Sequence, residues 1–161
     1  MRARATTRDR CLSNDAAAAA HAEHGAAFAW TQRVYYQHTD AGGMVFHANY
    51  LAFMENARTE MLQAAGVDLG KLLREDGVCF IVHSAHIAYK KPALLNDLLT
   101  VTARISQAGR ARLVFDQQAL RGDEVLAQAE ITIACVDAQT HRPIPLPGAV
   151  RERFSESEPK Q

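Results

Sequence analysis

The sequence predicts a single α+β domain in which one long helix lies across an antiparallel sheet of five strands. Only one segment, residues 47–65, has apolar residues spaced by three and four, which is the pattern of an amphipathic helix. The other ordered segments alternate between apolar and polar residues, as half-buried strands do. Mostly short turns join the last four of these strands, and short turns favour antiparallel neighbours.

The size and composition suit one globular domain. The chain has 161 residues, of which 48% are hydrophobic, enough for one core. Its 18 basic and 18 acidic residues cancel, so no overall field attracts nucleic acid or an anionic membrane. No apolar run approaches the roughly 20 residues that a membrane span needs. The odd, widely spaced cysteines (Cys11, Cys79 and Cys135) favour a reducing compartment, which predicts a cytoplasmic location.

The two ends differ from the middle of the chain. Residues 1–26 combine four arginines with an alanine run and faintly resemble a signal peptide. Asp9, Asp15 and Glu23 interrupt that pattern, so a flexible Ala/Arg-rich extension is the preferred interpretation. Residues 155–161 are polar and are expected to fray. The domain is therefore expected over residues 27–154.

The first strand is expected over residues 28–37, and a turn at residues 41–43 ends it. The long helix follows, with Gly66 as a stop signal and a short second helical turn over residues 69–75. The strand places Phe28, Trp30, Val34 and Tyr36 on one face, and the helix places Leu51, Met54, Ala57, Met61, Leu62 and Ala65 on one stripe.

Four more strands are expected over residues 78–90, 99–106, 113–119 and 125–135. In the first of them, Ile81, Ile87 and Tyr89 have the same parity and are expected to share a face. Turns near residues 107–109 and 121–123 separate the later strands. Regular structure is expected to end at Pro143, Pro145 and Pro147.

Residues 35–50 carry the strongest functional signal. Asp40 precedes a Gly-Gly turn, and a helix begins near His47. The first N–H groups of a helix are unpaired and carry a partial positive charge, which suits the oxyanion of an acyl-transfer reaction. From its position alone, Asp40 is equally well explained as a base or nucleophile and as a turn residue that accepts backbone hydrogen bonds.

Other candidate sites are weaker. His38, Asp40 and His47 form a possible metal-ligand set, but no further ligand pattern accompanies them. The cysteines of the strands are expected to act as small core residues instead of nucleophiles. The basic pairs at residues 90–91 and 110–112 are typical of solvated charges, although arginine also suits phosphate groups.

Residues 35–62 resemble the signature of hotdog-fold acyl-CoA thioesterases of the 4-hydroxybenzoyl-CoA thioesterase type, in particular the bacterial branch associated with the Tol–Pal envelope system. The resemblance extends over about residues 28–154. It implies a five-stranded sheet wrapped around the helix, edge-to-edge pairing of protomers, and active sites at the dimer interface. The implied partners are an acyl-CoA substrate, a second copy in a homodimer or homotetramer, and envelope or lipid-synthesis proteins. No cofactor or metal is implied.

The resemblance also implies roles for individual residues. The catalytic carboxylate falls on Asp40, and the backbone N–H that polarises the carbonyl falls on His47. His38 departs from the family pattern, since many relatives carry an acidic residue there. A protonated His38 would favour the ionised form of Asp40. Substrate contacts are expected at Gly43, Val45, Phe46, Tyr50, Arg110 and Arg112, with Tyr50, Phe53 and Met54 shaping the acyl pocket.

The expected activity is hydrolysis of an acyl-CoA thioester to a free acid and CoA. Asp40 would either attack the carbonyl or activate a water molecule, and the sequence leaves both routes open. Two alternatives remain at this point: a hotdog hydratase or dehydratase that acts on acyl thioesters, and a non-catalytic protein that binds acyl-CoA.

Overall fold

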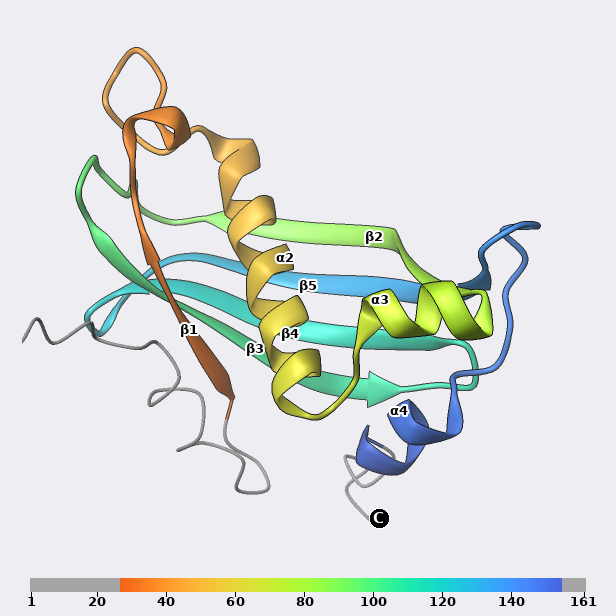
Figure 1. Cartoon of the computed structure of the whole chain (residues 1–161). Coiled ribbons are helices and arrows are strands. Elements are labelled where there is room, and N and C mark those ends of the chain that lie inside the picture. The colour runs from red at the N-terminus through yellow and green to blue at the C-terminus, as the bar shows by residue number, and fades with distance from the viewer. Residues whose placement is uncertain (1–26, 155–161) are drawn as a thin grey trace, which may run out of the picture.

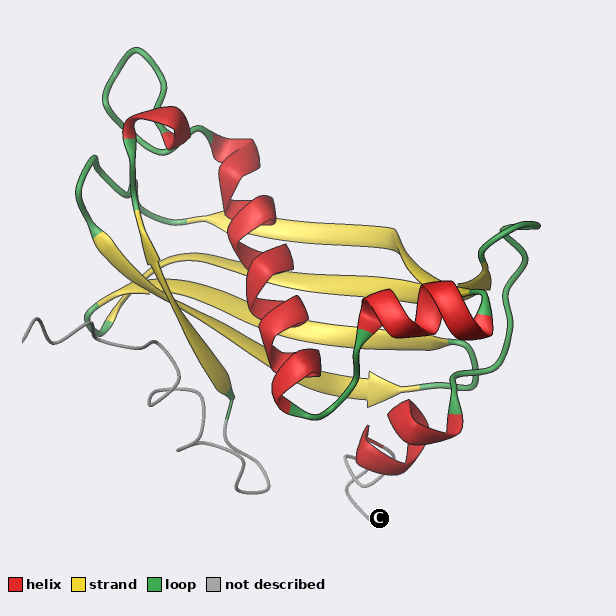
Figure 2. Cartoon of the chain, viewed as in Figure 1, coloured by secondary structure: helices red, strands yellow, loops and turns green. Residues whose placement is uncertain are grey.

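A computed structural model describes residues 27–154 and shows a five-stranded antiparallel sheet with one long helix across one face (Figure 1). The strand order is β1-β3-β4-β5-β2, so β1 and β2 are the edges. The predicted α+β arrangement is confirmed. The predicted N-terminal extension and C-terminal tail lie outside the described residues. The strands are β1 (Phe28–Arg33), β2 (Val78–Tyr89), β3 (Leu98–Ala108), β4 (Arg112–Arg121) and β5 (Glu124–Asp137), and Figure 2 shows them together with the helices.

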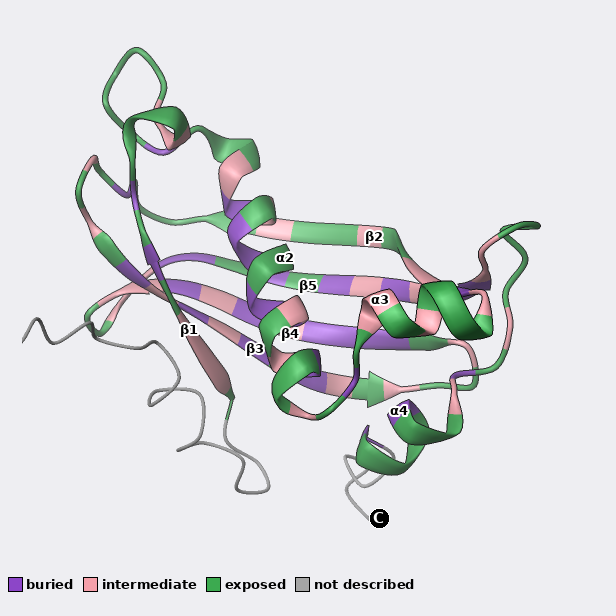
Figure 3. Ribbon diagram, in the orientation of Figure 1, coloured by how far each residue is buried: buried purple, intermediate pink, exposed green. Residues whose placement is uncertain are grey.

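The long helix, α2 (His47–Ala64), packs mainly against β1, β3 and β4. Its buried stripe differs from the predicted one: Leu51, Met61 and Ala65 are only half-buried, whereas Tyr50 and Phe53 are buried. Figure 3 shows the buried residues of α2 on the side that faces the sheet. Full burial of one large apolar side chain contributes about 1.5–3 kcal/mol, so this stripe holds the helix on the sheet. The buried residues of α2 are Tyr50, Phe53, Met54, Ala57, Arg58 and Leu62.

A polar pair lies between α2 and the sheet. Arg58 donates from Nη1 to Oε1 of the buried Gln117 on β4 (2.7 Å). Gln117 donates from Nε2 to the carbonyl oxygens of Met54 (3.0 Å) and Thr102 (3.2 Å). Burial lowers the pKa of the Arg58 guanidinium, and its ion pair with Glu55 opposes that shift. Every buried polar atom in this network has a partner, as a low-dielectric interior requires.

The first predicted strand ends earlier than expected. β1 stops at Arg33, and Tyr36–His38 form a single 3₁₀ turn, η1. The cause is local: the Nδ1 atom of His38 accepts a hydrogen bond from the N–H of Tyr35 (3.0 Å), which bends the chain. Tyr36 lies in this turn and is 81% exposed, so its predicted place on one strand face with Phe28, Trp30 and Val34 was wrong.

The predicted face of β2 was also wrong. The pairing register of β2 with β5 shifts between Val82 and Ser84, which marks a β-bulge. A bulge moves every later side chain to the other face. Ile87 and Tyr89 therefore point to the helix side of the sheet, whereas Ile81 points to the opposite side.

Two further helical segments complete the described chain. The predicted second helical turn is present as α3 (Leu69–Lys71) and the π-helical η2 (Leu72–Asp76). A helix that was not predicted, α4 (Gly148–Phe154), follows Pro147, whose carbonyl accepts the N–H of Val150 (3.0 Å). The φ angle of proline suits the start of a helix. The sequence interpretation treated these prolines only as signals that end regular structure. Between residues 27 and 154 no helix is both long and apolar enough to cross a membrane.

Candidate active site

The segment between η1 and α2 forms a closed turn, residues 39–45, called here the Asp40 turn. An isolated antiparallel bridge pairs Thr39 with Val45. Inside it, the N–H of Asp40 donates to the carbonyl of Met44 (2.8 Å), and the N–H of Gly43 donates to the carbonyl of Asp40 (3.0 Å). Gly43 has a φ of +73°, a left-handed conformation that glycine adopts without strain. Gly43 is thus needed for the turn itself.

The two oxygens of the Asp40 carboxylate have different surroundings. Oδ1 accepts hydrogen bonds from the N–H groups of Gly42 (2.8 Å) and Met44 (3.4 Å). Oδ2 has no hydrogen-bond partner among residues 27–154, and the side chain is exposed. The turn-capping interpretation therefore holds for one oxygen, and the other is free to meet a ligand.

The helix α2 starts without a side-chain cap. Its N-cap residue is Phe46, which has no side-chain acceptor, and the N–H of Asn49 donates to the carbonyl of Phe46 (2.8 Å). Within the described part of the chain, the N–H groups of His47 and Ala48 have no acceptor. These donors and the helix dipole together make a small region of positive potential beside the Asp40 turn.

Three hydrogen bonds hold the start of α2 in place. The hydroxyl of Tyr89, the last residue of β2, donates to the carbonyl of His47 (3.0 Å). The carbonyl of His38 accepts from the N–H of Phe46 (2.9 Å) and from Nδ2 of Asn49 (2.8 Å). The start of α2 therefore lies beside the last residue of β2, which is an edge strand of the sheet (Figure 1).

The metal-site alternative is not supported by the arrangement of its residues. The ring of His38 is engaged elsewhere: Nδ1 accepts the N–H of Tyr35, and the ring packs edge-on against Phe53 at 4.9 Å between centroids. The ring of His47 lies against Phe46 at 4.3 Å. Over residues 27–154, no three His, Cys, Asp or Glu side chains lie close enough to share a metal ion.

The predicted substrate-binding residues near the Asp40 turn differ in their exposure. Gly43 and Phe46 are exposed, and Val45 is buried within the turn. Tyr50 is buried, and its hydroxyl accepts the N–H of Ala93 (2.9 Å). Burial raises the pKa of Tyr50. Tyr50 thus supports a neighbouring loop in this chain, and the expected pocket residues Phe53 and Met54 belong to the core.

Arg110 and Arg112 lie far from Asp40 within one chain. They flank the turn between β3 and β4, whereas the Asp40 turn adjoins the opposite end of β3. β3 has 11 residues, so the two ends are about 35 Å apart. A single chain therefore does not bring these arginines to the Asp40 turn.

Burial and ion pairing account for the remaining candidate site residues from the sequence analysis. Cys135 is fully buried, and burial raises the pKa of its thiol to about 11, so it is unsuited to act as a nucleophile. Lys91 forms an ion pair with Glu124 (2.5 Å), which neutralises part of the basic pair at residues 90–91.

A separate groove of about 990 Å³ is lined by residues from β2, β3, β4 and β5 together with Ala27. Its polar lining includes His86, Glu130 and the ion pair of Arg104 with Asp116 (2.7 Å). No residue of the Asp40 turn or α2 lines it, so this groove is distinct from the candidate site.

The sequence interpretation missed the loop at residues 90–97, called here the support loop, which lies against the Asp40 turn. The N–H of Val45 donates to the carbonyl of Ala93 (2.9 Å). Asn96 has a φ of +70°, and Asp97 accepts the N–H of Leu94 (2.8 Å). An Asn-Asp pair after a proline is a turn signal, but nothing in the sequence indicates which other loop it contacts.

Comparison with known proteins adds independent evidence. The family described as the thioesterase-like superfamily matches residues 34–154. The acyl-CoA thioesterase YbgC of Haemophilus influenzae is 39% identical over 127 residues, covering 79% of this chain and 93% of the relative. The long-chain acyl-CoA thioesterase FadM of Escherichia coli K12 is 32% identical over 121 residues, covering 74% and 90%. The crystal structure of a probable thioesterase from Bartonella henselae has a TM-score of 0.73 and 34% identity, covering 76% of this chain and all of that chain.

Proposed function

The chain belongs to the thioesterase-like superfamily, and we propose that it hydrolyses acyl-CoA thioesters to a free acid and CoA, with Asp40 as the acting carboxylate. Thioester hydrolysis is the activity named for its relatives. One observation carries the role of Asp40: its free Oδ2 lies on a turn that leads directly into the uncapped start of α2. A carboxylate and unpaired N–H donors are the two groups that hydrolysis of an acyl bond needs.

In this mechanism the thioester carbonyl oxygen accepts a hydrogen bond from the N–H of His47. Charge that develops on this oxygen is stabilised by the helix start, and one well-placed donor of this kind contributes about 100- to 1000-fold in rate. Asp40 either attacks the carbonyl carbon through Oδ2, expelling the CoA thiolate and leaving an anhydride that water cleaves, or takes a proton from a water molecule that attacks. Its Oδ1, held by Gly42 and Met44, keeps the carboxylate oriented in both routes.

The variant Asp40→Asn tests this assignment. Asparagine retains an oxygen that can accept the N–H of Gly42, so the turn is expected to fold, but it is neither a base nor a nucleophile. We expect thiol release from a panel of acyl-CoA substrates to fall by about 100-fold or more. Turnover like that of the wild type would refute the role of Asp40.

The variant His47→Ala separates the backbone of His47 from its side chain. It keeps the N–H group at the helix start and removes the imidazole, so a much smaller loss than that of Asp40→Asn is expected. An equal loss would show that the imidazole takes part in the chemistry. The same thiol-release assay distinguishes hydrolysis from hydration, which leaves the thioester intact, and from binding without turnover.

We also propose that a second copy pairs along β2 to complete the site. β2 is a 12-residue edge strand with three exposed large apolar side chains, Ile81, Val82 and Tyr89. An open edge of this kind can hydrogen-bond to another strand. Antiparallel pairing of two β2 strands about a twofold axis carries the β3–β4 turn of one protomer to the sheet end that holds Asp40 of the other. Arg110 and Arg112 of the partner subunit are then proposed to contact the phosphates of CoA.

A further inference from the structure

Backbone hydrogen bonds join the support loop to the Asp40 turn. The N–H of Val45 donates to the carbonyl of Ala93 (2.9 Å), and the N–H of Leu95 donates to the carbonyl of Gly43 (3.3 Å). Between these two hydrogen bonds an isolated antiparallel bridge joins the loops. Any displacement of the support loop therefore displaces the turn that presents Asp40.

The conformation of the support loop depends on Asp97. Its Oδ2 accepts the N–H of Leu94 (2.8 Å), which closes the loop on itself. The preceding residue, Asn96, has a φ of +70°, a conformation that few non-glycine residues adopt and that needs support from its surroundings. Asp97 itself is only about 20% exposed.

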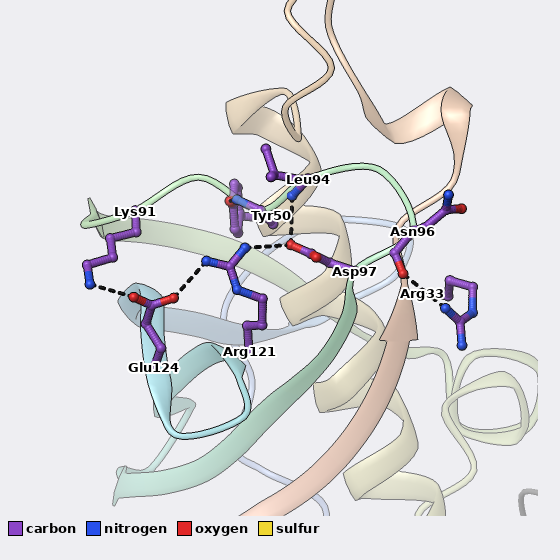
Figure 4. Close-up of polar contacts among 9 residues, drawn as sticks. Arg33, Tyr50, Lys91, Leu94, Asn96, Asp97, Arg121 and Glu124 are labelled. Carbon is purple, nitrogen blue, oxygen red and sulfur yellow. Dashed lines mark hydrogen bonds and ion pairs between the residues drawn. The ribbon is translucent and has the colours of Figure 1, made fainter.

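A chain of ion pairs ties both ends of this loop to one hairpin. Arg121, at the end of β4, donates from Nη1 to Oδ2 of Asp97 (2.8 Å) and from Nη2 to Oε2 of Glu124 (2.7 Å). The other oxygen of Glu124 receives Nζ of Lys91 (2.5 Å). Figure 4 shows this line of contacts from Lys91 through Glu124 and Arg121 to Asp97. Lys91 and Asp97 lie at opposite ends of the support loop, so the β4–β5 hairpin clamps it at two points.

The pKa directions agree with this geometry. Hydrogen bonds to Glu124 and Asp97 raise the pKa of Arg121, and contacts with Lys91 and Arg121 lower the pKa of Glu124. Arg121 and Glu124 are thus charged at neutral pH, and Arg121 is the residue that connects Glu124 with Asp97.

We propose that Arg121 is a positioning residue for thioester hydrolysis: by holding Asp97 it fixes the support loop and, through that loop, the Asp40 turn. The proposal rests on the proposed function. Arg121 touches neither the acyl group nor CoA in this scheme. A misplacement of about 1 Å at a reacting group can cost about 100-fold in rate, so a remote ion pair can govern turnover.

A plain surface ion pair would behave differently. Exposed pairs contribute little to stability, about 0–1 kcal/mol, and have no reason to influence turnover. The chain offers a matched control in Arg104, which pairs with Asp116 at a similar distance (2.7 Å) from a neighbouring strand but lies outside the candidate site.

The test compares Arg121→Met with Arg104→Met in the full chain. We expect Arg121→Met to lower kcat by about tenfold or more with KM within about twofold, and Arg104→Met to leave both unchanged. Arg121→Lys should recover part of the loss, since one ammonium group keeps one of the two contacts. Because Arg121 acts through Asp97, adding Arg121→Met to Asp97→Asn should cause little further loss. Thermal unfolding would verify that each variant is folded.

Hydrogen exchange gives a second readout that is independent of activity. Protection of the amides of Val45 and Leu95 should fall in Arg121→Met and remain in Arg104→Met. A folded Arg121→Met with normal kcat, or with reduced kcat and unchanged protection of these amides, would overturn the proposal. If the wild type releases no thiol from any acyl-CoA, the proposed function fails. Loss of amide protection at Val45 and Leu95 in Arg121→Met would then still support the role of Arg121 in positioning the Asp40 turn. Unchanged protection of these amides would refute that role.

Discussion

At the scale of single residues, Asp40 and Asp137 both accept backbone hydrogen bonds in turns, with different consequences. One oxygen of Asp40 is used by its turn and the other remains free. Oδ1 of Asp137 accepts three hydrogen bonds, from the N–H of Gln139 and from the N–H and hydroxyl of Thr140 (3.1, 2.7 and 2.8 Å). Asp137 therefore behaves as a structural residue, and its effect on stability can be measured through pH.

Asp137→Asn is expected to destabilise the protein at pH 7 and to lose this effect in acid. Hydrogen bonds from Thr140 hold the pKa of Asp137 below its ordinary value. Because the folded pKa is depressed, the stabilisation is present above the unfolded pKa, about 3.9, and disappears as the pH falls through the folded pKa. Urea unfolding measures the free energy of unfolding of both proteins at pH 7 and near pH 3. The difference in this free energy between wild type and variant should be smaller near pH 3 than at pH 7.

A difference of equal size at both pH values would contradict this prediction. Asp123→Asn is the matched control, because Asp123 lies in the β4–β5 turn and its side chain has no hydrogen bond or ion pair with the described residues. Its effect on the free energy of unfolding at pH 7 should be small.

At the scale of elements, the contact of α2 with the sheet depends on a polar residue in an apolar row. Leu113, Phe115 and Ala119 of β4 are fully buried, and Gln117 lies among them. A polar side chain is tolerated there only because Arg58 and two backbone carbonyls satisfy its hydrogen bonds.

Gln117→Leu is expected to lower the free energy of unfolding by about 1–3 kcal/mol, although leucine is apolar and similar in size. The substitution removes one of the two acceptors of the buried Arg58 guanidinium, which keeps only its ion pair with Glu55, so a buried N–H donor loses its partner. Denaturant unfolding measures the loss. Gln118→Leu, on the next residue of β4, should change stability by no more than about 0.5 kcal/mol. Equal effects of the two substitutions would show that the Arg58 contact is unimportant.

At the scale of the whole molecule, the parts of the proposed site lie far apart within one chain. Asp40 and the start of α2 lie at one end of the sheet, and the basic β3–β4 turn lies at the other. Strand β2 offers the edge along which a second copy would bring these parts together. Val82 is 53% exposed on this edge, at the bulge.

Val82→Lys is expected to prevent pairing along β2 and to reduce thioesterase activity together with it. A charge in the middle of an apolar edge opposes strand pairing. Analytical ultracentrifugation should show monomers, and thiol release should fall in parallel. Leu73→Lys is the control, since Leu73 is similarly exposed (50%) but lies in η2 and not on the edge strand itself. A dimeric, inactive Val82→Lys variant, or a fully active monomer, would refute the role of this edge.

Much of the fold could be predicted because its signals are local. The spacing of apolar residues over 47–65 identified α2 to within one residue, and alternation identified the five strands. Local signals failed where one side chain changes the backbone path, as His38 does at the end of β1, or where a bulge reverses the faces of a strand, as at Val82.

The sequence by itself determined α2, the five strands, and the order of carboxylate, glycine turn and helix start at residues 40–47, because each depends on neighbouring residues. It left open whether Asp40 caps a turn or faces a ligand. Only the tertiary structure decided that its two oxygens have different surroundings, that Tyr50 supports a loop, and that Arg121 reaches Asp97 across 24 positions of sequence. The contacts of Tyr50 and Arg121 form between residues that are distant along the chain, so they follow from how the strands and helix pack and leave no periodic trace in the sequence.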